Sequence, residues 1–533
     1  MQEVYVMRTI YYNGQVYTGK DMQQAFIVED GCFVQVGSND LVNLKLDADF
    51  LVDLNHQFVC SGFNDSHMHI VNYGNYLLNG KLDEHTTSLK EMCEYMRLFI
   101  QEHEISSGSW VKGRGWNQDY FTDVKRMPNR FDLDTITTEH PMYLTRVCGH
   151  CLVVNTKALE VMGVDLETCD ENIRNGIFYD DTLEQVYAFV PIPTKEDIKK
   201  MIKAACKQLN TYGVTSSQSD DYCMFRSVGY STINEAYEEL KQEGKLSVRV
   251  YQQANFESVD GLRDFVEKGH MTGCGDASYK IGPLKILGDG SLGARTAYLS
   301  IPYASDSTTR GMLCFSEQEI EDMVMYAHKA GMQIAIHTIG DKCLDVVLDA
   351  YEKALTAYPR NDHRHGIVHM QISRKDQLER MQKLQLHTYA QTIFLDYDIH
   401  IVEECVGKDL ASTSYSWKSL MDMGLTVSNG TDCPVEMPNA LAGMQCAITR
   451  TDRKDSVKPY LAQQAFTVKE ALDSYTKQGA YASFEESVKG QIKEGYYADF
   501  VVLEENPFMV DVNKIQDIVV KQTYVAGDCV YSK

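Results

Sequence analysis

The sequence predicts an α/β fold, a (β/α)8 barrel of the TIM type, because short β-rich apolar segments alternate with segments of helical periodicity such as 317–330 and 341–357. Between residues 213 and 425 this alternation repeats roughly every 35 residues, close to the ~31 residues per unit of a typical barrel. The eight predicted barrel strands are 57–70, 213–219, 246–255, 279–287, 332–337, 366–369, 386–391 and 425–429.

Two further segments do not fit the barrel repeat. The stretch between the first two predicted strands is too long for one crossover helix, so we expect an insertion at about residues 80–205 of a barrel that spans 59–484. Both ends of the chain are typical of short strands separated by turns, with hairpin signals at Asn13-Gly14 and Asp30-Gly31. Because chain termini often lie close together, residues 1–58 and 485–533 are predicted to form one small discontinuous β-sandwich.

The composition indicates a globular protein and disfavours anionic partners. The 533 residues are 44% hydrophobic and 24% charged, and the net charge of −24 disfavours binding to nucleic acid or to anionic membranes. The sequence has no apolar window of ~18 residues and no basic N-terminal region before an apolar stretch, so we expect neither a membrane span nor a leader. Fifteen irregularly spaced cysteines are typical of reduced thiols and favour a cytoplasmic location.

Four histidines and one aspartate follow the predicted strands. His67 and His69 are two residues apart, a spacing that points both side chains to the same face of a strand. His337, His369 and Asp432 each stand at the carboxyl end of another predicted strand, the face on which barrel enzymes carry their active sites. Nitrogen and carboxylate donors that converge there suit Zn²⁺ or a similar divalent ion, and the sequence therefore predicts a metal centre.

The chain resembles the amidohydrolase superfamily, and most closely the family 3 branch that includes the N-substituted formamide deformylases. The resemblance covers nearly the whole chain and is carried by residues 25–31, 62–69, 113–117, 337–341, 430–435 and 495–500. It implies that His67 and His69 hold one metal ion and that His337 and His369 hold a second. It also implies that Asp432 binds metal and acts as the general base.

Lys285 lies in the fourth predicted strand, where many relatives carry a carboxylated lysine that bridges two metal ions. An ammonium group would be repelled by two cations, whereas a carbamate would supply two anionic oxygens. In the alternative interpretations, Lys285 binds a carboxylate of the substrate or pairs with Asp289. The sequence leaves open whether the centre holds one ion or two.

The resemblance also implies substrate-side residues within the insertion. His150 is expected to polarise the substrate carbonyl, and Trp116 and Arg146 are expected to contact the substrate. The alternative interpretations are that His150 is a surface or hinge residue and that Trp116 only packs in a tight turn.

We therefore expect a metal-dependent hydrolase that cleaves an amide-like C–N bond in a small molecule with metal-activated water, without an organic cofactor. A homodimer is the default assembly of the family. A mononuclear deaminase is one alternative, although Gly340 occupies the position of its essential glutamate and only the adjacent Asp341 could replace it. A non-catalytic scaffold is another alternative, and the spacing of Cys148 and Cys151 allows a thiol–disulfide oxidoreductase.

Overall fold

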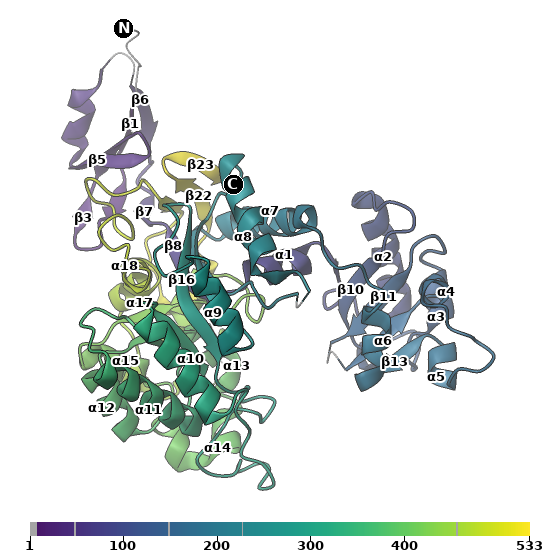
Figure 1. The fold of residues 1–533 in the computed structure, drawn as a ribbon. Coiled ribbons are helices and arrows are strands. Elements are labelled where there is room, and N and C mark those ends of the chain that lie inside the picture. The colour runs from purple at the N-terminus through teal and green to yellow at the C-terminus, as the bar shows by residue number, and fades with distance from the viewer. Residues whose placement is uncertain (1–7, 47–48, 148–149, 226, 455–456) are drawn as a thin grey trace. The chain divides into compact units, whose positions relative to one another are not determined.

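The computed structural model describes residues 8–46, 49–147, 150–225, 227–454 and 457–533 (Figure 1). The chain forms two compact units. Unit 1 comprises Met1–Ile70 and Ala205–Lys533, and unit 2 comprises Val71–Ala204. Of the expected N-terminal β segment, residues 1–7 and 47–48 lie outside the described residues.

Unit 1 contains a nearly closed barrel of eight parallel strands, which confirms the predicted fold. Each barrel strand falls within a predicted segment or within one residue of it, and two have the predicted bounds. The strands, in spatial order, are β8 (Phe63–Met68), β14 (Val214–Ser219), β15 (Arg249–Asn255), β16 (Tyr279–Leu287), β17 (Ile334–Thr338), β18 (Gly366–His369), β19 (His387–Ala390) and β20 (Val427–Asn429).

Helices connect and cover these strands. They have apolar faces, and the two helices expected at 317–330 and 341–357 form within one residue of the predicted bounds. The main helices of unit 1 are α8 (Gly229–Gln242), α9 (Val259–Glu267), α10 (Glu317–Lys329), α11 (Asp341–Ala357), α12 (Lys375–Lys383), α14 (Val402–Ala411), α15 (Trp417–Asp422), α16 (Ala440–Thr449), α17 (Val468–Ser474) and α18 (Lys477–Ala482). Among the described residues, no helix is both long and apolar enough to cross a membrane.

The segment 57–70, predicted as one strand, is two strands that belong to different sheets. β7 (Phe58–Ser61) pairs with β21 (Phe500–Leu503), whereas β8 pairs with β14 in the barrel. The chain changes sheets at Gly62, where a Cβ atom would lie 2.2 Å from the Oγ1 atom of Thr215. Periodicity could not reveal this division, because both strands are fully buried and read as one apolar run.

Strands from both ends of the chain share one six-stranded sheet, in which the purple N-terminal strands lie beside the yellow C-terminal strands (Figure 1). Its order is β23 (Asp528–Ser532), β22 (Val520–Val525), β21, β7, β2 (Gln15–Tyr17) and β3 (Met22–Gln23). The first 53 residues also supply a four-stranded sheet, with the order β5 (Cys32–Gly37), β4 (Ala25–Glu29), β1 (Arg8–Tyr12) and β6 (Phe50–Asp53). Tyr11 and Phe26 pack with Phe500 and Tyr524 in a common core. The domain limits at residues 58 and 485 stay a prediction.

Unit 2 lies in the sequence between β8 and β14, the position at which the insertion was expected. It contains a five-stranded sheet with the order β13 (Ile177–Tyr179), β12 (Cys151–Val154), β11 (Met142–Arg146), β10 (Val111–Trp116) and β9 (Gly80–Lys81). Its helices include α2 (Leu89–Glu102), α3 (Arg130–Asp134), α4 (Thr156–Met162) and α6 (Leu183–Tyr187). Two apolar clusters of its own give this unit an independent core.

A buried ion cluster connects the segment after α18 to the barrel strands. The carboxylate of Glu485 lies 2.8 Å from Nζ of Lys280 in β16 and 2.5 Å from Nζ of Lys489. Lys489 is 4% exposed and also donates a hydrogen bond of 2.7 Å to Ser216 in β14. We expect Glu485→Gln to destabilise the protein by about 3–5 kcal/mol, because it leaves two buried or half-buried ammonium groups without their counterion. Urea unfolding at pH 7 measures this loss.

The same substitution should change how stability depends on pH. Burial raises the pKa of Glu485, but Lys489 and Lys280 lower it more strongly, so that the pKa is about 2 instead of the usual 4.5. The stabilisation is therefore complete above pH ~4.5 and disappears as the pH falls towards 2, and the wild type and the variant should converge in that window. Glu504→Gln is the control, since the pair of Glu504 with Lys521 is solvent-exposed and should contribute ~0–1 kcal/mol. Equal losses for both variants would contradict the prediction.

Candidate metal centre

Closure of the barrel brings the ends of β8 and β20 together. The backbone N–H of Asp432 donates to the carbonyl of His67 at 2.8 Å, and that of His69 donates to the carbonyl of Cys433 at 2.8 Å. Gly430 permits this approach, because a Cβ atom there would lie 2.6 Å from the backbone nitrogen of His67. The loop after β20 therefore runs directly beside the histidine pair.

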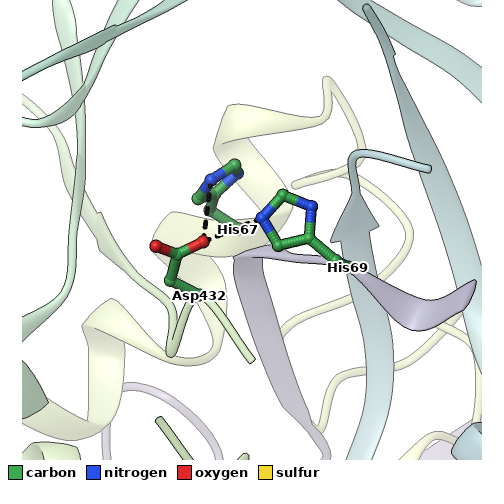
Figure 2. A group of neighbouring side chains, drawn as sticks. All are labelled: His67, His69 and Asp432. Carbon is green, nitrogen blue, oxygen red and sulfur yellow. Dashed lines mark hydrogen bonds and ion pairs between the residues drawn. The ribbon is translucent and has the colours of Figure 1, made fainter. Parts of the chain in front are cut away.

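His67, His69 and Asp432 face one another in this region (Figure 2). The Oδ1 atom of Asp432 lies 3.3 Å from Nε2 of His67 and 3.0 Å from Nε2 of His69. Within the described residues, these three side chains are the group whose candidate ligand atoms all lie within 4.8 Å of one another. The sequence predicted all three, although they are up to 365 positions apart.

The hydrogen bonds of the two imidazoles define their tautomer. Nδ1 of His67 lies 2.7 Å from Oε1 of Gln253, and Nδ1 of His69 lies 2.7 Å from the carbonyl of Asp220. Each Nδ1 must carry the proton, because a carbonyl oxygen can only accept. Nε2 of each ring therefore faces Asp432, an arrangement that fits a divalent metal ion held by imidazole and carboxylate.

Charge in the centre also favours a cation. Burial raises the pKa of Asp432, but the adjacent imidazoles of His67 and His69 outweigh this effect and keep the pKa well below its usual value. Burial lowers the pKa of His69, but the hydrogen bond and charge of Asp432 raise it to about 9. The ionised carboxylate thus attracts a proton to His69 when no metal is bound, and a divalent cation would replace that proton.

His369 lies at the end of β18, next to this group. Its ring centroid is 5.5 Å from that of His67 and 4.4 Å from that of His337. Nδ1 of His369 lies 2.7 Å from Oε1 of Gln391, so this imidazole also keeps its proton on Nδ1 and its lone pair on Nε2. His369 therefore has the same orientation as His67 and His69, with Nδ1 bound to an oxygen acceptor and Nε2 left for a metal ion.

His337 is oriented differently. Its Nε2 atom lies 3.1 Å from the carbonyl of Gly290 and 3.6 Å from Oδ1 of Asp289, so Nδ1 is the nitrogen left for a metal. Burial lowers the pKa of His337 to about 3, and the positive charge of Lys285 contributes to this shift. The imidazole is therefore neutral at physiological pH, as a metal ligand must be.

Lys285 is 1% exposed and lies close to the histidines. Burial is the main cause of the lowered pKa values of His67 and His369, and the charge of Lys285 lowers both further. The carboxylate nearest to Nζ of Lys285 is that of Asp220, at 3.5 Å. The expected alternative pairing with Asp289 is not formed, because the carboxylate of that residue accepts hydrogen bonds from the backbone amides of Tyr298, Ile339 and Gly340.

The predicted substrate-side residues all belong to unit 2. Trp116 is fully buried in β10, and its indole N–H donates to the carbonyl of Leu144 at 2.9 Å, as expected of a packing residue. Arg146 in β11 donates to Oε1 of Gln118 at 2.9 Å. The side chain of His150 is 79% exposed and lies 3.1 Å from Oδ1 of Asp180. The substrate contacts of these residues stay predictions.

Two alternatives expected from the sequence find little structural support. Asp341 begins α11 and is fully buried, where its carboxylate pairs with Arg374 at 2.6 Å and accepts from the backbone of Ser300 at 2.9 Å. It is therefore already engaged and poorly suited to act as the acid of a deaminase. Of the two cysteines considered for redox chemistry, Cys148 lies outside the described residues and Cys151 is buried in β12.

Sequence reasoning missed the residues that orient the histidines. Gln253 lies in β15, Asp220 directly follows β14 and Gln391 directly follows β19. The available signal was their place at the carboxyl ends of barrel strands, the same signal that identified the histidines. Polar residues are common at such positions, so this signal alone could not select them.

A nearly closed parallel barrel that carries histidines and a carboxylate at its strand ends defines the class of metal-dependent hydrolases. The model of the amidohydrolase family matches residues 51–531, and the chain therefore belongs to the amidohydrolase family.

Two known proteins are similar to this chain over nearly its full length. The putative amidohydrolase YtcJ of Bacillus subtilis is 29% identical, over 99% of this chain and 100% of that protein. The N-substituted formamide deformylase of Arthrobacter pascens is 25% identical, over 96% of this chain and 95% of the deformylase. Among solved structures, an uncharacterized metal-dependent hydrolase from Pyrococcus furiosus has a TM-score of 0.78 and 27% identity, and the match covers 94% of this chain and 100% of that one.

Proposed function

We propose that this protein hydrolyses an amide-like C–N bond, such as that of an N-formyl or N-acyl amine, and that Zn²⁺ is its metal. The observation that carries the proposal is the common tautomer of His67, His69 and His369, whose Nε2 lone pairs are left for a metal beside the ionised Asp432. The similarity to a formamide deformylase supports the choice of bond.

Each residue then has a defined chemical task. A bound divalent ion supplies Lewis-acid activation of water and of the substrate carbonyl. Asp432 accepts the proton of the attacking water and returns it to the departing nitrogen. In Figure 2 the second carboxylate oxygen of Asp432 points away from both imidazoles, so neither imidazole engages it. His150 would assist by donating a hydrogen bond to the carbonyl oxygen.

We also propose that Lys285 is carboxylated and bridges two metal ions. Its closeness to His67, His337 and His369 supports this role, because an ammonium group at that place would repel the metals that these histidines bind. His337 and His369 would then hold the second ion. A carbamate on Lys285 would supply one oxygen to each ion.

Metal content measured by mass spectrometry, on protein purified without added metal or chelator, tests these proposals. Two equivalents of zinc per chain would support the bridged centre, and Lys285→Ala should then retain about one. One equivalent in the wild type would contradict the carboxylated bridge. In parallel, N-formyl and N-acyl amines are screened for release of formate or another carboxylate. A chain that takes up no metal on titration would overturn the hydrolase proposal.

A further inference from the structure

Two buried glutamines contact the metal centre in the same manner. Gln253 accepts a hydrogen bond from Nδ1 of His67, and Gln391 accepts one from Nδ1 of His369, both at 2.7 Å. Gln253 is 0% exposed and Gln391 is 1% exposed. Each glutamine therefore offers its Oε1 atom to a histidine and keeps its Nε2 donors for another partner.

The orientation of both amides is determined by chemistry. A flipped glutamine would place its NH2 group against Nδ1, and the imidazole would have to move its proton to Nε2. The lone pair of Nε2 would then be lost to the metal. The carbonyl oxygen of each glutamine must consequently face its histidine.

The two glutamines differ in what their donors do. Nε2 of Gln253 donates to the carbonyl of Ser66 at 3.2 Å. Nε2 of Gln391 is buried and has no hydrogen-bond partner among the described residues. A buried donor without a partner is unfavourable, so such a group is usually completed by a ligand or by water.

We infer that Gln391 has two roles: its Oε1 atom positions His369, and its Nε2 atom donates a hydrogen bond to the acyl oxygen of the bound substrate. Gln391 follows β19, the strand next to β18, at the end of the barrel that carries the metal ligands. The unpartnered Nε2 atom of Gln391 belongs to the same amide group whose Oε1 atom contacts His369, so this donor lies beside the metal centre. The second role rests on the proposed hydrolysis of an acyl compound, whereas the first does not.

Three variants separate these roles. Gln391→Leu removes both the acceptor and the donor. Gln391→Glu keeps an acceptor for His369 but removes the donor. Gln253→Glu makes the same chemical change beside His67, where the donor is already used by the carbonyl of Ser66, and so adds the charge without removing a donor proposed to contact the substrate. Zinc affinity is measured by competition with a chelator, and acetohydroxamate serves as an acyl-like probe of the zinc-loaded protein. Circular dichroism checks that each variant is folded.

We expect Gln391→Leu to weaken zinc binding about 10–100-fold and Gln391→Glu to restore it. Gln391→Glu should bind acetohydroxamate about 10-fold more weakly than Gln253→Glu does. Wild-type zinc affinity in folded Gln391→Leu would overturn the positioning role. Equal affinity of Gln391→Glu and Gln253→Glu for acetohydroxamate would overturn the donor role. Nε2 of Gln391 would then donate only to water and not to the ligand. Both readouts remain valid if no acyl amine proves to be a substrate, so failure of the inference and failure of the proposed function are distinguishable.

Discussion

Asp432→Asn is expected to lower kcat about 10²–10⁴-fold in the metal-loaded protein, because an amide cannot accept the proton of the attacking water. The substitution keeps the shape of the side chain and an oxygen near His67 and His69. It should also weaken metal binding, since the neutral amide no longer compensates the charge of the cation. Activity is therefore compared at saturating zinc, with hydrolysis of the best N-acyl or N-formyl amine as the measurement.

The control for this variant is Asp260→Asn in α9, a carboxylate whose side chain is 88% exposed and which pairs with Arg263 at the surface. It changes the net charge by the same amount without touching the centre, and its kcat should equal that of the wild type. If Asp432→Asn retained more than about a third of the wild-type kcat at saturating zinc, Asp432 could not be the general base.

His67→Ala combined with His69→Ala should remove the ion that these two histidines hold beside Asp432 and reduce hydrolysis below detection. Both Nε2 atoms that face the carboxylate are lost, and Asp432 without them is too small a ligand set to hold Zn²⁺ tightly. A ligand present at a thousand times its Kd stabilises a folded protein by about 4 kcal/mol. The increase in Tm that excess zinc produces in the wild type should therefore be clearly smaller in the double variant, because one of the two ions is lost.

His270→Ala is the matched control, because this half-buried histidine stacks on Phe265 and lies in the loop after α9. It should keep both the metal content and the increase in Tm. A double variant that still bound two equivalents of zinc, or that showed the wild-type increase in Tm, would place the metal elsewhere in the chain. Comparing the Tm of the metal-free wild type with that of the metal-free double variant then separates loss of metal binding from loss of folding.

Most of the barrel could be predicted because its parallel strands are buried on both faces. Such strands are short continuous apolar runs bounded by turn signals, and each of the eight was recognisable without knowledge of its partners. The division of the segment 57–70 at Gly62 was different, because it depends on the closeness of Thr215 in another strand. A contact between segments that are distant in sequence does not change the hydrophobic periodicity of either segment, so the sequence pattern cannot reveal it.

The grouping of the histidines and Asp432 could be predicted because the topology of a parallel barrel brings every strand end to one face. The partners of their side chains could not. Gln253 and Gln391 orient two of the histidines, and Lys285 pairs with Asp220 rather than with Asp289. The indole of Trp116 packs in the core of unit 2, a contact that the sequence allowed but did not specify.

The sequence by itself determined the order of strands and helices, the class of fold and the residues able to bind a metal. These properties depend on local periodicity and on the kind of side chain at each strand end. Only the tertiary structure decided the tautomer of each histidine and the residue that holds it, because hydrogen bonds of 2.7 Å depend on the positions of atoms in different strands. That precision arises from closure of the barrel, which no segment of the chain can specify alone.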